Sequence, residues 1–197
     1  MLPRSRADDK RPLDYRRPVV RMARPFVRGA FDWGILPPFA CAMQFPNSEP
    51  CAENQFLAEH VGNLLMSLRR WTGRDLVEPQ LPMIEQARRI FVAPFAVLSH
   101  NANADPILNY GNRAAMQLFE LSWDELIVTP SRLTAEPVHR DERARLLDAV
   151  MRHGFIDNYQ GIRVSKTGRR FSIEKATVWT VLDGQGATYG QAATFTA

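Results

Sequence analysis

The sequence predicts an α+β fold, in which two short strands precede a cluster of short helices and three further strands complete the chain. Three observations predict it. Apolar residues recur at helical spacing between residues 53 and 91. Short runs of apolar and β-branched residues recur after residue 95, and glycine-containing turns separate the last of these runs. With 197 residues, 45% of them hydrophobic, the chain is long enough for one domain and an extension.

Residues 1–50 are predicted to be a disordered, basic extension rich in proline and arginine, because eight prolines interrupt any helical period. Residues 1–42 contain nine Lys or Arg and four Asp, which leaves 16 of the 25 basic and 17 of the 21 acidic residues for the rest. The excess of positive charge therefore belongs to the extension. The composition becomes ordinary from Met43 onward. We interpret Met43 as the true initiator and residues 1–42 as a mis-assigned start.

Residues 53–94 are predicted to be an N-terminal helical segment ahead of a core that spans residues 95–197. The first helix runs from Glu53 to about Trp71 and ends at Gly73. Its apolar stripe consists of Leu57, Val61, Leu65 and Leu68. The second helix spans Met83 to Phe91, with Pro82 in its first turn. An amphipathic helix in this place is expected to pack on the sheet or to form a homodimer.

The first half of the core contains two strands and several short helices. The strands are Phe95 to Ser99 and Ile107 to Tyr110. Asn112 is expected to cap a helix that runs through Phe119. Ser122 and Glu125 have the spacing of a capping box, and a further short helix or turn is expected near residues 130–134.

The second half begins with a helix from His139 to His153, whose buried stripe is expected to be Leu147, Val150 and Met151. Gly154 ends this helix, and turns at 166–168 and 183–186 divide the remainder into three strands. These strands are Tyr159 to Ser165, Arg170 to Leu182, and Thr188 to Phe195. Strand alternation places one set of side chains on a single face of the sheet: Phe171, Ile173, Thr177, Trp179 and Val181.

Several segments of this core resemble the PAS sensory fold: residues 109–115 (NYGNRAA), 121–126 (LSWDEL), 138–143 (VHRDER) and 166–171 (KTGRRF). Residues 129–137 (TPSRLTAEP), with 159–161 and 176–179, are similar to the MEKHLA family in its small stand-alone bacterial form. This resemblance covers about Phe56 to Phe195. It implies a PAS-like five-stranded antiparallel sheet with helices on one face, preceded by the amphipathic helix.

The resemblance implies a non-catalytic sensory module that binds a ligand or a protein, and that takes part in signalling or transcriptional regulation through a partner. A small molecule is a candidate ligand, and a protein partner or a homodimer is expected. The space between sheet and helices holds ligands in PAS-like folds, although aromatic side chains there also serve simply as core. The candidate pocket residues are Asn109, Phe119, Trp123, Phe155, Tyr159, Arg163, Phe171 and Trp179.

No cofactor can be named from the sequence. Segment 129–137 has no cysteine for a flavin adduct, and His139 and His153, at the two ends of a predicted helix, are weak haem candidates. Asp157 and Glu174 could face each other across strands, but solvated charges at the edge or rim of the sheet are the preferred interpretation. The histidines are not paired at metal-ligand spacing. Two alternatives remain open: a small α+β enzyme with an unrecognised pocket, and nucleic-acid binding through the basic extension, the less favoured partner.

The expected location is the cytoplasm. Cys41 and Cys51 have neither the number nor the spacing of a disulfide framework or a CxxC motif, which favours two free thiols. No apolar stretch approaches the roughly 20 residues of a membrane-spanning helix, and the basic N-terminus lacks the apolar core of a secretory signal. No membrane association is expected.

Overall fold

The computed structural model describes residues 48–136 and 140–196. Its centre is a five-stranded sheet in the order β2-β1-β5-β4-β3, with antiparallel neighbours throughout. The strands are β1 (Ala96–Asn101), β2 (Leu108–Gly111), β3 (Phe155–Val164), β4 (Arg170–Leu182) and β5 (Thr188–Thr196). The predicted sheet is confirmed. The expectations for residues 1–47, among them Met43 and Cys41, and for His139 lie outside the described residues.

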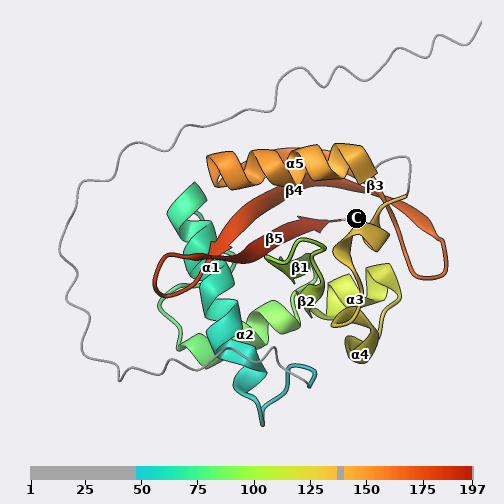
Figure 1. Ribbon diagram of the computed structural model, residues 1–197. Helices are drawn as coiled ribbons and strands as arrows, with labels where there is room; N and C mark the ends of the chain where they lie inside the picture. The colour runs from blue at the N-terminus through green and yellow to red at the C-terminus, as the bar shows by residue number, and fades with distance from the viewer. Residues whose placement is uncertain (1–47, 137–139, 197) are drawn as a thin grey trace, which may run out of the picture.

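Helices cover both faces of this sheet (Figure 1). After β2 come α3 (Arg113–Phe119), α4 (Trp123–Leu126) and η2 (Ser131–Thr134), followed by α5 (Arg140–His153), which lies along β3 and β4. On the opposite face, α1 (Ala58–Thr72) packs on β4, and α2 (Met83–Phe91) packs on α1. A short turn, η1 (Gln55–Leu57), precedes α1. None of the helices in the described ranges has both the length and the apolar character to cross a bilayer.

Local capping signals were predicted correctly. The side chain of Asn112 accepts a hydrogen bond from the Ala115 N–H at 3.0 Å, and Ser122 forms a capping box with Glu125. Gly73, with φ of 71°, ends α1, and its N–H donates to the Arg69 carbonyl. Gly154 ends α5 with φ of 86°, and any Cβ there would lie 2.3 Å from the Trp71 ring. These residues fix where the helices that surround the sheet begin and end.

Three details of the helices differ from the prediction. The first helix begins at residue 58, not 53, because Gln55, Phe56 and Leu57 have φ values near +55° that an α-helix cannot include. Pro82 lies at the N-cap of α2 and not inside its first turn. Met151 of α5 is 63% exposed, whereas Val150 is fully buried, since Val150 alone of the two packs on Ile156 and Val178 of the sheet.

The prediction that Phe171, Ile173, Thr177, Trp179 and Val181 share one face of the sheet is wrong. The register of β4 shifts by one residue between Ile173 and Ala176 against β3 and between Glu174 and Thr177 against β5. Lys175, within both intervals, has φ of 51°. A matching irregularity in β3 includes Asn158, with φ of 56°. Strand parity therefore reverses, so that Phe171 and Ile173 pack near α3 while Trp179 and Val181 pack under α1.

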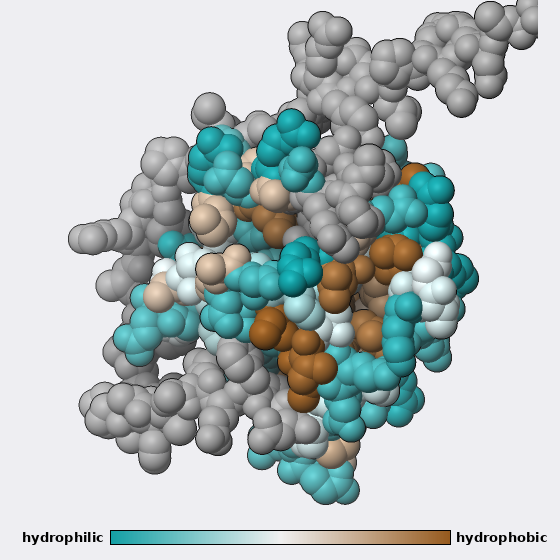
Figure 2. All heavy atoms as spheres, turned by 45° about the vertical axis from the view of Figure 1, so that its right-hand side comes forward, coloured by the Kyte–Doolittle hydropathy of each residue, from teal (hydrophilic) through white to brown (hydrophobic). Residues whose placement is uncertain are grey.

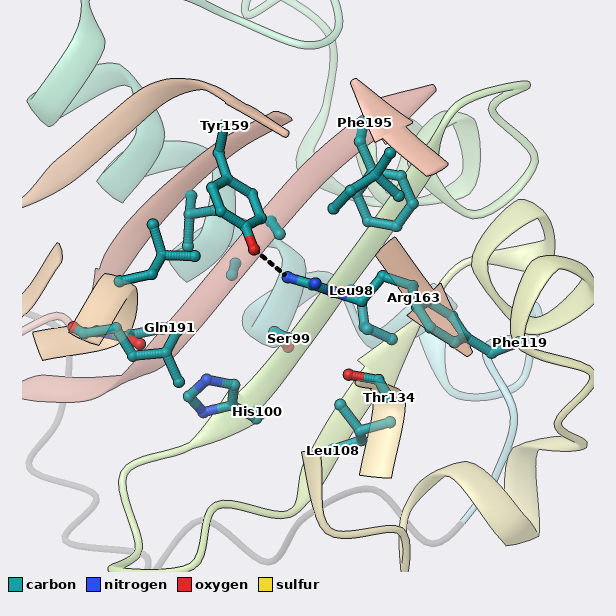
Figure 3. Close-up of a pocket in the computed structure, with 16 residues that line it drawn as sticks. Leu98, Ser99, His100, Leu108, Phe119, Thr134, Tyr159, Arg163, Gln191 and Phe195 are labelled. Carbon is teal, nitrogen blue, oxygen red and sulfur yellow. Dashed lines mark hydrogen bonds between the residues drawn. The ribbon is translucent and has the colours of Figure 1, made fainter. Parts of the chain in front are cut away.

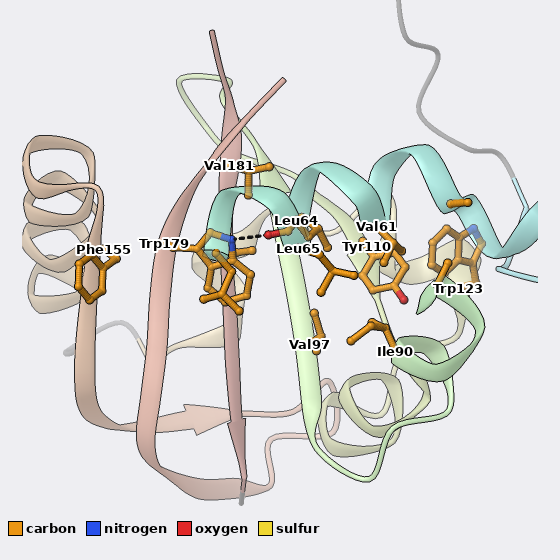
Figure 4. Close-up of a cluster of buried hydrophobic side chains, with 14 residues drawn as sticks. Val61, Leu64, Leu65, Ile90, Val97, Tyr110, Trp123, Phe155, Trp179 and Val181 are labelled. Atoms are coloured by element: carbon orange, nitrogen blue, oxygen red, sulfur yellow. Dashed lines mark hydrogen bonds between the residues drawn. The ribbon is translucent and has the colours of Figure 1, made fainter. Parts of the chain in front are cut away.

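The largest hydrophobic cluster lies between α1, α2 and the sheet (Figure 4). Val61, Leu64 and Leu68 of α1 are at most 1% exposed. The Trp179 indole N–H donates to the Leu64 carbonyl at 3.1 Å, and the Trp71 indole donates to the Thr180 carbonyl at 2.8 Å. The apolar stripe of α1 is thus buried against the chain's own sheet.

Candidate functional site

A cavity of about 60 Å³ lies on the opposite face of the sheet from α1, between the strands and α5 (Figure 3). Its wall is mainly apolar and comes from every strand of the sheet and from α3 and α5. The apolar side chains that line it are Leu98, Leu108, Phe119, Leu146, Leu147, Ile173, Val178 and Phe195. A largely apolar wall with a few polar groups is typical of a small-molecule site.

The most polar part of the wall is a pair of side chains from β3. Arg163 donates from Nη2 to the Tyr159 hydroxyl oxygen at 3.1 Å, and its guanidinium carbon lies 5.2 Å from the centre of the Tyr159 ring. Figure 3 shows this pair facing the cavity. Gly161 lies between them in the strand, and a Cβ on it would approach the Tyr159 hydroxyl to 2.6 Å. The missing side chain at Gly161 leaves the space in which Tyr159 and Arg163 meet.

Four further polar residues line the cavity, of which Ser99 is described with its partners below. Gln191 of β5 donates from Nε2 to the Leu147 carbonyl of α5 at 2.8 Å. The Thr134 hydroxyl donates to the Ser131 carbonyl at 2.8 Å. His100 Nδ1 lies 2.8 Å from the Asn101 carbonyl oxygen. His100, Leu147 and Gln191 also line a second cavity, of about 210 Å³, at the turn between β1 and β2, so the two cavities share a wall.

A chain of buried polar groups connects β1, in the cavity wall, to α1 on the other face. Ser99 donates to the Asn109 side-chain oxygen at 2.6 Å and lies 3.1 Å from His60 Nε2, while His60 Nδ1 lies 3.1 Å from the Tyr189 hydroxyl. This pattern places the imidazole proton on Nε2, because the Ser99 hydroxyl already donates to Asn109. Burial lowers the pKa of His60 to about 4 and raises that of Tyr110, whose ring stacks on the imidazole.

The structure brings three of the eight candidate pocket residues together. Phe119, Tyr159 and Arg163 line the cavity. Phe171 lies behind Phe119, with the ring centres 5.1 Å apart, and Asn109 accepts the bond from Ser99. The other three belong to the cluster under α1: Trp123, Phe155 and Trp179. The two bulges explain the separation, since Phe155 and Tyr159 flank Asn158, and Phe171 and Trp179 flank Lys175.

Sequence reasoning missed His100, Thr134 and Gln191. All six residues of β1 are buried, so the alternation that would assign His100 to a face is absent from that strand. Gln191 did carry a signal, because an amide in the middle of a buried strand needs a partner within the protein. Thr134 lies in a short helical turn, for which the sequence has no face-specific pattern.

No metal centre emerges from the described ranges, which contain no group of three or more His, Cys, Asp or Glu placed to hold an ion. Asp157 does not face Glu174. Its carboxylate instead accepts bonds from Arg74 at 2.5 Å and from the Thr177 hydroxyl at 2.8 Å, on the α1 side of the sheet. His153 is exposed at the end of α5, away from the cavity wall.

Comparison with known proteins adds a family and a fold. A family model described as MEKHLA domain matches residues 58–197. The homeobox-leucine zipper protein HOX29 of Oryza sativa is 32% identical over 97 residues, which are 47% of this chain and 11% of the rice protein. The chain therefore corresponds to a small part of that relative.

Two solved structures are similar in fold. An RNA-binding light-oxygen-voltage receptor superposes with a TM-score of 0.52 and 18% identity, over 64% of this chain and 36% of that one. The PAS domain of a protein from Colwellia psychrerythraea has a TM-score of 0.49 and 16% identity, over 57% of this chain and 92% of that one. The similarity to the light-oxygen-voltage receptor establishes a PAS-like fold and does not identify a ligand.

Proposed function

The chain belongs to the MEKHLA domain family, and we propose that this PAS-like sensory module holds a small molecule in the cavity beneath α5. The observation that carries the proposal is the makeup of that cavity. Apolar side chains line most of it, and a buried cation and a tyrosine hydroxyl converge at one side. A small molecule bound there would contact the sheet and α5 together.

The proposed output is a change in how α5 lies on the sheet. The buried cluster between α5 and the sheet is small: Val150 with Ile156 and Val178. Two side-chain bonds support it, from Gln191 to the Leu147 carbonyl and from Thr180 to the Val150 carbonyl. Leu146, Leu147 and Ala149 of α5 are only partly buried beside this cluster, so we expect α5 to respond to small changes in the wall below it.

A protein partner, or a second copy of the chain, would read that change. Figure 2 shows the side of the molecule on which α3 and α4 lie, where apolar side chains gather near the middle of the face. Val128 and Leu133, which follow α4, are 67% and 44% exposed. Exposed apolar groups of this kind favour a protein contact. The apolar stripe of α1 is less suited to contact a partner, because the chain's own sheet covers it.

The role we propose is non-catalytic, and the cytoplasm is its proposed location. The polar groups of the cavity support the first part, because Tyr159, Gln191 and Thr134 are each held in structural hydrogen bonds. The spacing of Cys41 and Cys51, which suits free thiols, supports the second.

Native mass spectrometry of the purified full chain, with an absorption spectrum of the same sample, tests the proposal. We expect an additional bound mass that is lost when Ala193, in the cavity wall, is replaced by Leu to fill the space. The matched control is Ala187→Leu, in the exposed turn before β5. A mass that persists in Ala193→Leu, or a chain that takes up no molecule from a broad metabolite panel, contradicts the proposal.

A further inference from the structure

Arg163 is a buried cation without a described counter-ion. The residue is 8% exposed, and the groups that its guanidinium contacts are neutral: the Ile162 carbonyl at 3.0 Å, the Tyr159 hydroxyl at 3.1 Å and the Tyr159 ring. Among the side chains that the structure describes, which belong to residues 48–136, 141 and 144–196, no carboxylate forms an ion pair with its guanidinium. An arginine stays charged at any ordinary pH, and burial of an unpaired charge is costly. An anion that bound at this point would therefore interact strongly with Arg163.

The position of this cation is built into the strand. Tyr159, Gly161 and Arg163 follow one another on the cavity face of β3. A Cβ on Gly161 would lie 3.2 Å from Arg163 Nη1, so the glycine leaves room for the guanidinium beside the Tyr159 hydroxyl. The described residues accept bonds from two of its five N–H groups. No described residue accepts a bond from the other three, and Arg163 lines the cavity.

The rest of the cavity defines the remaining chemistry of the ligand. Among the described residues that line it, Arg163 alone is Lys or Arg, which suits a single negative charge better than a phosphate dianion. A guanidinium fork matches a planar carboxylate. Aliphatic side chains, among them Leu98, Leu108 and Ile173, form much of the rest of the wall. The cavity volume of about 60 Å³ admits only a small molecule.

From this arrangement we infer that the ligand is a small aliphatic carboxylate, whose carboxylate pairs with Arg163 and the Tyr159 hydroxyl while its chain lies on the leucine wall. The inference rests on the proposed function, since it names the class of molecule that the cavity takes. The buried charge also predicts the behaviour of the empty protein. Removal of Arg163 relieves an unpaired charge and so leaves the ligand-free chain at least as stable as before.

The test is calorimetric titration and thermal unfolding of the full chain with butanoate and hexanoate. The matched neutral probes are butanamide and hexanamide, the cationic probe is butylammonium, and inorganic phosphate is the other anion. We expect the carboxylates to bind and to raise Tm, and each amide to bind at least 10-fold more weakly than its acid. Arg163→Met should weaken carboxylate binding by about 100-fold and keep Tm without ligand equal to or above that of the wild type.

Arg163→Lys is a second variant, which keeps the charge but loses the fork, and it should weaken carboxylate binding by about 10-fold. Arg69→Met, on the exposed side of α1, is the control and should change neither binding nor probe preference. Equal binding of acid and amide, or carboxylate binding that survives Arg163→Met, overturns the inference. If only neutral, cationic or phosphate probes bind, the carboxylate is wrong but the sensory cavity stands. If no probe of any class binds and the purified chain also carries no bound mass, both proposals fail.

Discussion

At the scale of single residues, His60 is the group whose ionisation most affects the fold. It lies within α1 beneath the Tyr110 ring, with Ser99 and Tyr189 at its two ring nitrogens. Each neighbour is neutral, so nothing in the described surroundings compensates for an added positive charge. Burial accordingly lowers the pKa of His60 from 6.5 to about 4.

This pKa makes the stability of the protein depend on pH. Between pH 6.5 and 4 the unfolded chain binds a proton at His60 that the folded chain excludes, so the free energy of unfolding falls as the pH falls through this window. We expect a loss of about 3 kcal/mol across it, measured by urea unfolding at several pH values. His60→Gln should flatten this dependence, whereas His153→Gln, on the exposed end of α5, should retain it. An unchanged pH slope in His60→Gln would contradict the assignment.

At the scale of elements, the bulges in β3 and β4 determine which side chains lie on each face of the sheet. Lys175 has a left-handed backbone, which costs a residue with a Cβ about 1 kcal/mol or more. Because of this bulge, one strand contributes side chains to the hydrophobic clusters on both faces of the sheet. Ala176 and Val178 face the helices α3 and α5, and Trp179 and Val181 face α1.

Glycine at the bulge should therefore stabilise the protein. We expect Lys175→Gly to raise the free energy of unfolding by up to about 1 kcal/mol, because glycine adopts positive φ without the steric penalty. The matched control is Ser172→Gly, which is exposed in the regular part of the same strand and should lower stability by about 0.5 to 1 kcal/mol. Chemical denaturation of both variants gives the comparison, and a loss of stability in Lys175→Gly would show that the left-handed backbone is not a source of strain.

The same bulges mark the limit of prediction from sequence. The ends of helices could be predicted from local sequence. The Asn112 cap, the Ser122 capping box and the end of α1 at Gly73 each follow from a residue type at a short spacing. The bounds of α2 and β4 were predicted to the residue. The face of the sheet on which each side chain lies could not be predicted, because nothing in the sequence indicates a bulge at Asn158 or Lys175. Each bulge moves every side chain beyond it to the other face. The candidate pocket residues consequently divided between the two faces.

At the scale of the whole molecule, the N-terminal helices are part of the fold and not an attachment to it. The buried side chains of α1 and α2 cover Trp179, Val181 and Val97 of the sheet (Figure 4). Each large apolar side chain that is buried contributes about 1.5 to 3 kcal/mol. The five side chains Val61, Leu64, Leu65, Leu68 and Ile90 therefore contribute about 7 to 15 kcal/mol, which is as large as the typical net stability of a domain, about 5 to 15 kcal/mol.

Truncation separates the parts of the chain that the fold needs. A chain that starts at Phe95 should lose its cooperative thermal transition, because the face of the sheet that holds Trp179 becomes exposed. A chain that starts at Met43 should unfold like the full chain. Circular dichroism and tryptophan fluorescence during heating distinguish the two. A cooperative transition in the shorter chain would show that the sheet is stable without its α1 layer.

The paired bulges also bear on how relatives of this chain are aligned. Each of β3 and β4 has one additional residue at neighbouring rungs of their shared ladder. A lineage that lost only one of the two would shift the hairpin out of register, whereas loss of both would restore the pairing and reverse the faces beyond it. Gaps at 158 and 175 should therefore arise together in evolution, accompanied by an exchange of large and small apolar residues between odd and even positions.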